Sequence, residues 1–149
     1  MDEFQIVVYS DNARTRRDVL AAIGIGAHAA MRIRCIEVAT AAALEQRMTS
    51  GDADLVILDA EATPVGGLGL ARQLKDEIDC CPPLIVLIGR SVDTWLAGWS
   101  RADAAVMHPG DPVRLSGVAM ALLRFHTAAQ RNSSGAPSVP TAAGVSSSR

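Results

Sequence analysis

The sequence has little excess charge, no long apolar run and no basic leader at its start. Its 14 basic and 16 acidic residues among 149 give a formal net charge of −2, so it has no large positive field with which to attract nucleic acid. Apolar runs such as residues 55–58 and 84–88 are far shorter than the ~20 residues that span a bilayer. Residues 1–3 are Met, Asp and Glu, without the basic and apolar regions of a signal peptide. We therefore expect a cytoplasmic protein that binds neither nucleic acid nor a membrane.

Lysine and cysteine are also scarce. Lys75 is the only lysine, and all other basic residues are arginines, so any function that needs a lysine must use Lys75. The three cysteines, which are Cys35 and the adjacent Cys80 and Cys81, form no CxxC pair. This arrangement predicts free thiols and gives no sign of a disulfide framework or a zinc site.

Strand and helix patterns alternate along the chain. Apolar and β-branched runs predict strands at residues 4–9, 32–38, 53–59, 84–88 and 103–107. Helical spacing of apolar residues predicts helices at residues 13–23, 41–48, 70–78, 93–100 and 112–126. Five strands that are each followed by a helix are typical of a doubly wound α/β fold with a five-stranded parallel sheet.

Two segments lack such patterns. Pro64 and the glycines at 66, 67 and 69 fit neither GxGxxG nor GxxxxGK[ST], so they predict a flexible loop rather than a phosphate-binding one. Residues 131–149 are mostly Ser, Ala, Pro, Gly and Val, and such a segment buries too little apolar surface to offset the entropy lost on ordering. We therefore expect one domain over residues 1–130 and a disordered tail over residues 131–149.

Polar side chains gather where the predicted strands end. Ser10 and Asp11 follow the first strand, Asp59 ends the third, Ile88 ends the fourth and His108 follows the fifth. In doubly wound sheets, ligands bind at the carboxyl ends of the strands. The sequence therefore predicts an acidic pocket with one imidazole at this edge. Strand-terminal aspartates also cap helices, and Asp11 is equally a candidate N-cap of the helix that follows.

The order of elements and the DLVILD strand followed by a Pro/Gly loop resemble the receiver domain of two-component response regulators, over about residues 4–126. The resemblance implies a flavodoxin-like (βα)5 fold, a histidine kinase as partner and no enzymatic activity. It matches Asp59 to the aspartate that accepts a phosphoryl group and Asp11 to the second of two magnesium-binding acids. It thereby implies a Mg²⁺ site formed by Asp11, Asp59 and the backbone carbonyl of Glu61.

Other positions depart from the family pattern. The first acid is replaced by Ser10, the hydroxyl residue by Ile88, the lysine by His108, an aromatic residue by Ala105, and the loop proline, Pro64, comes one residue late. Mg²⁺ should bind weakly, because the site has one carboxylate fewer. An imidazole, unlike a lysine, is not a fixed cation at neutral pH, and Lys75 on the third helix cannot replace it. Whether the His108–Pro109 bond is cis is left open.

Two of the few aromatic residues, Trp95 and Trp99, lie four residues apart on the fourth predicted helix and therefore on one of its faces. We expect at least one to pack into the core, and an exposed one to be a binding hot spot. In receivers, the fourth helix, fifth strand and fifth helix form the output and dimer surface. Arg114, Arg124 and Asp103 would border it.

Three functions follow from these observations. The leading hypothesis is an atypical stand-alone receiver in signal transduction, with weak or no phosphorylation, which binds a protein partner or itself through Trp95 and Trp99. The first alternative is a working single-domain response regulator phosphorylated on Asp59. The second is a small-ligand-binding or enzymatic flavodoxin-like domain that uses Asp11, Asp59 and His108 as an acid–base cluster.

Overall fold

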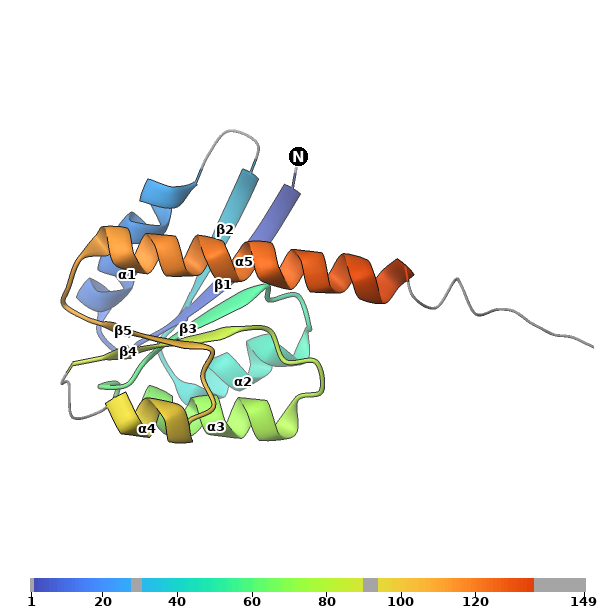
Figure 1. Cartoon of the computed structure of the whole chain (residues 1–149). Coiled ribbons are helices and arrows are strands. Elements are labelled where there is room, and N and C mark those ends of the chain that lie inside the picture. The colour runs from blue at the N-terminus through green and yellow to red at the C-terminus, as the bar shows by residue number, and fades with distance from the viewer. Residues whose placement is uncertain (1, 28–30, 90–93, 136–149) are drawn as a thin grey trace, which may run out of the picture.

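The computed structural model describes residues 2–27, 31–89 and 94–135, which form an alternating series of strands and helices (Figure 1). The strands are β1 (Asp2–Tyr9), β2 (Met31–Val38), β3 (Leu55–Asp59), β4 (Leu84–Ile88) and β5 (Ala104–Met107). The helices are α1 (Ala13–Gly26), α2 (Ala41–Thr49), α3 (Gly67–Glu77), α4 (Thr94–Trp99) and α5 (Pro112–Gly135).

The five strands form one parallel sheet in the order β2-β1-β3-β4-β5. Helices α1 and α5 cover one face of this sheet, and α2, α3 and α4 cover the other (Figure 1). The predicted doubly wound fold is confirmed. Because the order reverses next to β1, the carboxyl ends of β1 and β3 meet at the edge where such folds place their sites.

The two central strands are buried on both faces, which explains their uninterrupted apolar sequences. All five residues of β3 and of β4 are buried. Ile57 and Ile85 pack toward α1 and α5, whereas Leu58, Val86 and Ile88 pack toward α2, α3 and α4. The sheet thus separates two apolar cores, and its rigid strands fix the positions of the residues that follow them.

Helix α3 begins earlier than predicted, and the expected flexible loop is shorter. Gly67 and Gly69 lie inside the helix. A side-chain Cβ at Gly67 would come within 2.8 Å of the Asp59 main chain, and one at Gly66 within 2.8 Å of the Ala60 carbonyl oxygen. These glycines therefore allow close packing of the helix start against the end of β3, rather than chain flexibility.

Helix α5 ends later than predicted. It runs to Gly135, nine residues past the expected end at residue 126, and projects beyond the sheet (Figure 1). Ala, Gln and Arg after residue 126 are good helix formers, and Gly135 is the first helix breaker that follows them. The expected tail of residues 131–149 therefore starts inside this helix, and residues 136–149 lie outside the described part of the chain. No helix in the described residues is long and apolar enough to cross a membrane.

The cysteines are free thiols, as the sequence predicts. Burial raises the pKa of Cys35 and of Cys81 above the ordinary value. The negative charge of Glu37 adds to the increase at Cys35. Both thiols are therefore less reactive than exposed ones at neutral pH.

Candidate functional site

The polar residues at the strand ends surround one cavity of about 610 Å³. It is lined by Asp11, Asn12, Arg14, Thr15, Asp18, Asp59, Glu61, His108 and Pro109. The structure thus brings together the predicted Asp11, Asp59, Glu61 and His108. A second, mostly apolar cavity of about 240 Å³ adjoins it and shares Asp18, His108 and Pro109.

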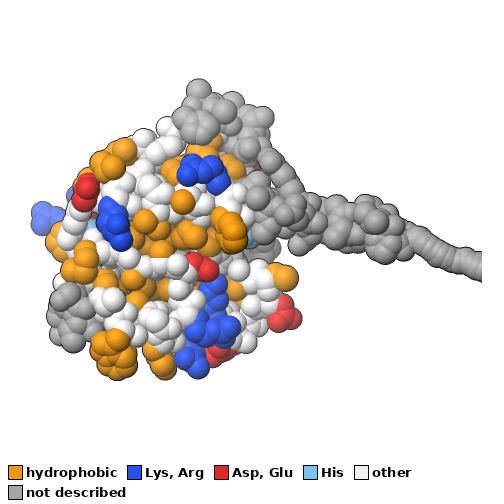
Figure 2. Space-filling model, viewed as in Figure 1, with side chains coloured by type: hydrophobic (Ala, Val, Ile, Leu, Met, Phe, Trp, Pro, Cys, Tyr) orange, Lys and Arg blue, Asp and Glu red, His pale blue; other side chains and the backbone are white. Residues whose placement is uncertain are grey.

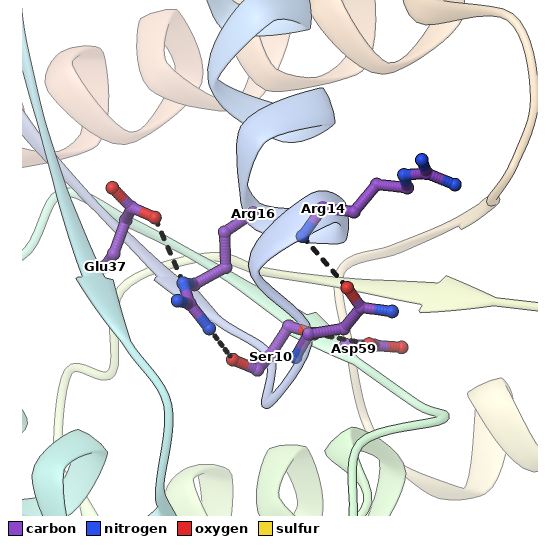
Figure 3. A network of polar contacts seen from close by, with 6 residues as sticks. Ser10, Arg14, Arg16, Glu37 and Asp59 are labelled. Carbon is purple, nitrogen blue, oxygen red and sulfur yellow. Dashed lines mark hydrogen bonds and ion pairs between the residues drawn. The ribbon is translucent and has the colours of Figure 1, made fainter.

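Asp59 is buried, and both of its carboxylate oxygens accept hydrogen bonds. The Ser10 hydroxyl donates to Oδ2 at 2.7 Å (Figure 3). The Glu61 backbone N–H donates to Oδ1 at 2.9 Å. A buried carboxylate is costly unless its oxygens are hydrogen-bonded. The two donors, both uncharged, meet this requirement for Asp59.

Ser10 is itself held in place from two sides. Its hydroxyl oxygen accepts a bond from the Asn12 N–H at 3.0 Å, and its carbonyl oxygen accepts one from the Arg16 guanidinium at 2.6 Å. Arg16 also pairs with Glu37 on β2 at 3.0 Å (Figure 3). Sequence reasoning did not assign these roles to Arg16 and Glu37, because nothing in the sequence shows that β2 lies beside the start of α1.

Asp11 is exposed and is not the cap of α1. Its Oδ2 accepts a bond from the Thr63 hydroxyl at 2.9 Å. The N-cap is Asn12, whose side chain accepts from the Arg14 N–H at 2.9 Å. The carboxylate of Asp11 is thus tied to the loop after β3, next to the cavity.

His108 lines the cavity next to α1. Its Nε2 lies 3.4 Å from Oδ2 of Asp18, and its backbone N–H donates to the Ile88 carbonyl at 3.0 Å. The His108–Pro109 bond is cis. Asp18 was missed in the sequence, although its place one turn after Arg14 could have shown that both residues share a face of α1.

The remaining family positions carry no phosphate-binding group. Ile88 is part of the core between the sheet and α3, and Ala105 is partly buried opposite Val86. Lys75 lies at the opposite end of the sheet, where its Nζ pairs with Asp103 at 2.8 Å. The one lysine of the chain is therefore far from Asp59 along the sheet, as its position in the third helix suggests.

Arg14 is a cation at the cavity that sequence reasoning missed. It lines the cavity from the first turn of α1, and Figure 3 shows its side chain extended away from Asp59. The inside of the site is negative in character. Burial, and then the charges of Asp11 and Asp59, raise the pKa of the neighbouring Tyr9 above the ordinary value.

The donor set fits Mg²⁺ in kind, because Asp11, Asp59 and the carbonyl of Glu61 offer the oxygen ligands that this ion takes. Only two of these ligands are carboxylates, since the third acidic position is Ser10. The described residues contain no group of three or more His, Cys, Asp or Glu side chains placed to hold a metal ion.

Comparison with known proteins places the chain in a family, although no family model matches it. Two response regulatory proteins, from two strains of Mycobacterium tuberculosis, are each 52% identical to it over 121 residues, which are 80% of this chain and 91% of the relative. The chain belongs to the response-regulator family. Its function is therefore that of a receiver domain in two-component signal transduction.

Solved structures show that this response regulator has the receiver fold. A CheY-like receiver domain from Methanospirillum hungatei has a TM-score of 0.67 at 15% identity, covering 83% of this chain and 96% of that one. A two-component response regulator from Clostridium difficile has a TM-score of 0.65 at 15% identity, covering 81% and 96%. The expected flavodoxin-like (βα)5 fold is confirmed.

The expected partner surface of this response regulator differs from the prediction in the exposure of its tryptophans. Both Trp95 and Trp99 are exposed, so the expectation that one packs into the core is wrong. Ala97 of the short α4 and Ser100, the residue directly after it, are buried instead. Asp103, expected to border the surface, pairs with Lys75 on α3.

Proposed function

We propose that this response regulator is an atypical receiver that acts in the cytoplasm by binding a protein partner, without depending on phosphorylation of Asp59. The observation that carries the proposal is the 2.7 Å hydrogen bond from the Ser10 hydroxyl to Asp59. Ser10 occupies the position of the first magnesium-binding acid in receivers. A neutral hydroxyl there stabilises the Asp59 carboxylate directly, so the site is satisfied without a cation.

The surroundings of Asp59 also disfavour an acyl phosphate. A phosphoryl group on this residue brings negative charge that receivers neutralise with a lysine, and His108 is paired with Asp18 instead. Ile88 offers no hydroxyl to a phosphoryl oxygen. Mg²⁺, when bound, would be held by Asp11, Asp59 and the Glu61 carbonyl and would supply positive charge, but with one carboxylate ligand fewer.

One observation favours the alternative in which Asp59 is phosphorylated by a histidine kinase. Arg14 lines the same cavity, and an arginine is a permanent cation with donors suited to phosphate. The enzymatic alternative has no such support. Asp11, Asp59 and His108 share the cavity, but the hydrogen bonds of Asp59 come from Ser10 and Glu61, and His108 pairs with Asp18.

Incubation with acetyl phosphate and Mg²⁺, followed by intact mass spectrometry at short times, tests the proposal. The wild type should gain no persistent phosphoryl group, and Asp59→Asn should behave in the same way. Ser10→Asp restores the acid pair and should increase the phosphorylated fraction. A phosphoryl group that accumulates on the wild type and disappears in Asp59→Asn would contradict the proposal.

A further inference from the structure

Helix α4 presents both tryptophans to solvent. Trp95 is 69% exposed and Trp99 is 49% exposed, while Ala97 and Ser100 pack inward. Residues four apart on a helix lie on one face. The two rings therefore form one apolar stripe, and tryptophan is the residue most enriched among binding hot spots.

The stripe is joined to α3 rather than to α5. The Arg72 guanidinium carbon lies 5.2 Å from the centroid of the Trp99 ring, and Arg72 also donates to the Trp99 carbonyl oxygen at 2.9 Å. A guanidinium over an aromatic face is attracted by the ring. These contacts fix Trp99 against α3, and we call Arg72, Asp76, Trp95, Trp99 and Arg101 the α3–α4 surface.

The charges of the α3–α4 surface do not balance. Asp76 pairs with Arg72 at 3.4 Å through one oxygen and with Arg101 at 2.5 Å through the other. Two guanidinium groups and one carboxylate leave a net positive charge beside two exposed rings. Figure 2 shows basic and hydrophobic side chains next to one another over the region of α3 and α4. The nearby Lys75 and Asp103 form a pair that adds no net charge.

We propose that the α3–α4 surface binds an acidic segment of a partner protein, with carboxylates on Arg72 and Arg101 and an apolar side chain against Trp95. This inference rests on the proposed function, because it names the partner chemistry of a protein-binding receiver. Arginine offers carboxylates two parallel hydrogen bonds. A second copy of this chain is a poor occupant, since two like surfaces would place positive charges together.

The surface offers its groups already in position. The ion pairs with Asp76 and the stacking on Trp99 restrict the Arg72 side chain before a partner arrives. Binding therefore costs less side-chain entropy than it would with free arginines. The same pairing keeps the charge of the surface modest, so affinity should depend on both the aromatic and the charged groups.

Selection of peptides from a random phage library against the whole protein, followed by affinity measurements with the selected peptides, tests this proposal. Enriched peptides should combine Asp or Glu with apolar residues. Trp95→Ala should weaken their binding at least about tenfold, and the double variant Arg72→Gln/Arg101→Gln should weaken it and reduce its dependence on salt. Circular dichroism checks that each variant is folded.

The matched controls lie away from this surface, on α5 and α1. Phe125 is 74% exposed and Arg17 is exposed, so Phe125→Ala and Arg17→Gln remove the same kinds of groups and should leave binding unchanged. Peptides whose binding is lost in these control variants but retained in Trp95→Ala would overturn the α3–α4 assignment. They would still agree with a protein-binding function. Enrichment of basic peptides would also overturn it. A selection that yields no binder would count against both proposals.

Discussion

The carboxylates at the two ends of the parallel sheet have different kinds of partner. At the amino end, Oδ2 of Asp103 accepts bonds from Lys75 at 2.8 Å and from the Leu84 N–H at 2.7 Å, so a carboxylate meets a cation. At the carboxyl end, Asp59 is bound by a hydroxyl and an amide beside an open acidic cavity. The only lysine of the chain thus stabilises the fold at the end where receivers carry out no chemistry.

This difference bears on function because a receiver needs its cation at the carboxyl end. A carboxylate whose oxygens accept hydrogen bonds from neutral donors is stable without a metal ion or a lysine. These donors do not offset the additional negative charge of a phosphoryl group. We therefore infer that this protein signals through its outer surface rather than through phosphorylation of Asp59. Changes at either end of the sheet test this contrast.

The largest effect is expected from Ser10→Asp at the carboxyl end. Ser10 is fully buried next to Asp59, so a second carboxylate there should lower the free energy of unfolding by about 3 kcal/mol without Mg²⁺. Chemical denaturation with and without Mg²⁺ measures the effect, and added Mg²⁺ should recover part of the loss. Ser10→Ala is the control, with a smaller loss that Mg²⁺ does not change.

At the amino end, Asp103→Ala should lower the free energy of unfolding by about 2 kcal/mol, because it leaves Lys75 and the Leu84 N–H without their shared acceptor. Urea denaturation measures this loss. The control is Asp76→Ala, whose ion pairs are exposed and should contribute no more than about 0.5 kcal/mol. Equal losses in the two variants would show that the Lys75 pair has no special role.

The packing behind Asp59 is tested by Gly67→Ala. Its Cβ would lie 2.8 Å from the Asp59 carbonyl, and such a clash with main chain should cost about 1–3 kcal/mol. Gly69→Ala is the matched control, because nothing lies within 4 Å of a Cβ there and the helix should gain about 0.5–1 kcal/mol. Thermal unfolding measures the stability of both variants. If neither substitution changes the unfolding temperature, the close packing of Gly67 against Asp59 is contradicted.

The smallest effect concerns the pH dependence of Tyr9, the only tyrosine. Burial first, then Asp11 and Asp59, raise its pKa above the ordinary value of 10.0. The unfolded chain therefore loses this proton at lower pH than the folded one, so stability is intact below pH 10 and falls as the pH rises above it. Absorbance titration of the phenolate should show Asp11→Asn lowering the Tyr9 pKa only in part, because burial remains.

The strand ends could be predicted from the sequence because apolar runs and their terminal residues are local features. Asp59 and Asp11 follow directly from such runs. The roles of Arg14, Arg16 and Asp18 could not be predicted in this way, because they depend on which side of α1 faces the cavity. That orientation is set by packing of α1 against the sheet and α5.

The predictions that Gly67 lies in a flexible loop and that a tryptophan of α4 packs into the core were wrong for the same reason. Gly67 looks like a loop residue by composition, yet it begins α3, where the absence of a side chain allows close approach to the Asp59 main chain. Trp99 looks like a core residue by size, yet Ala97 of α4 and Ser100 directly after it are buried, and Trp99 is exposed. In both cases the deciding contact is with another element: Gly67 lies against the end of β3, and Trp99 lies against Arg72 on α3.

The most direct test of the central claim is a calorimetric titration of the wild type and Ser10→Asp with Mg²⁺. If the Ser10 hydroxyl holds Asp59 in place of a metal-binding acid, Ser10→Asp should bind Mg²⁺ at least about tenfold more tightly, a difference of about 1.4 kcal/mol. Asp59→Asn should abolish what binding the wild type has. Equal Mg²⁺ affinities in the wild type and Ser10→Asp would contradict the account.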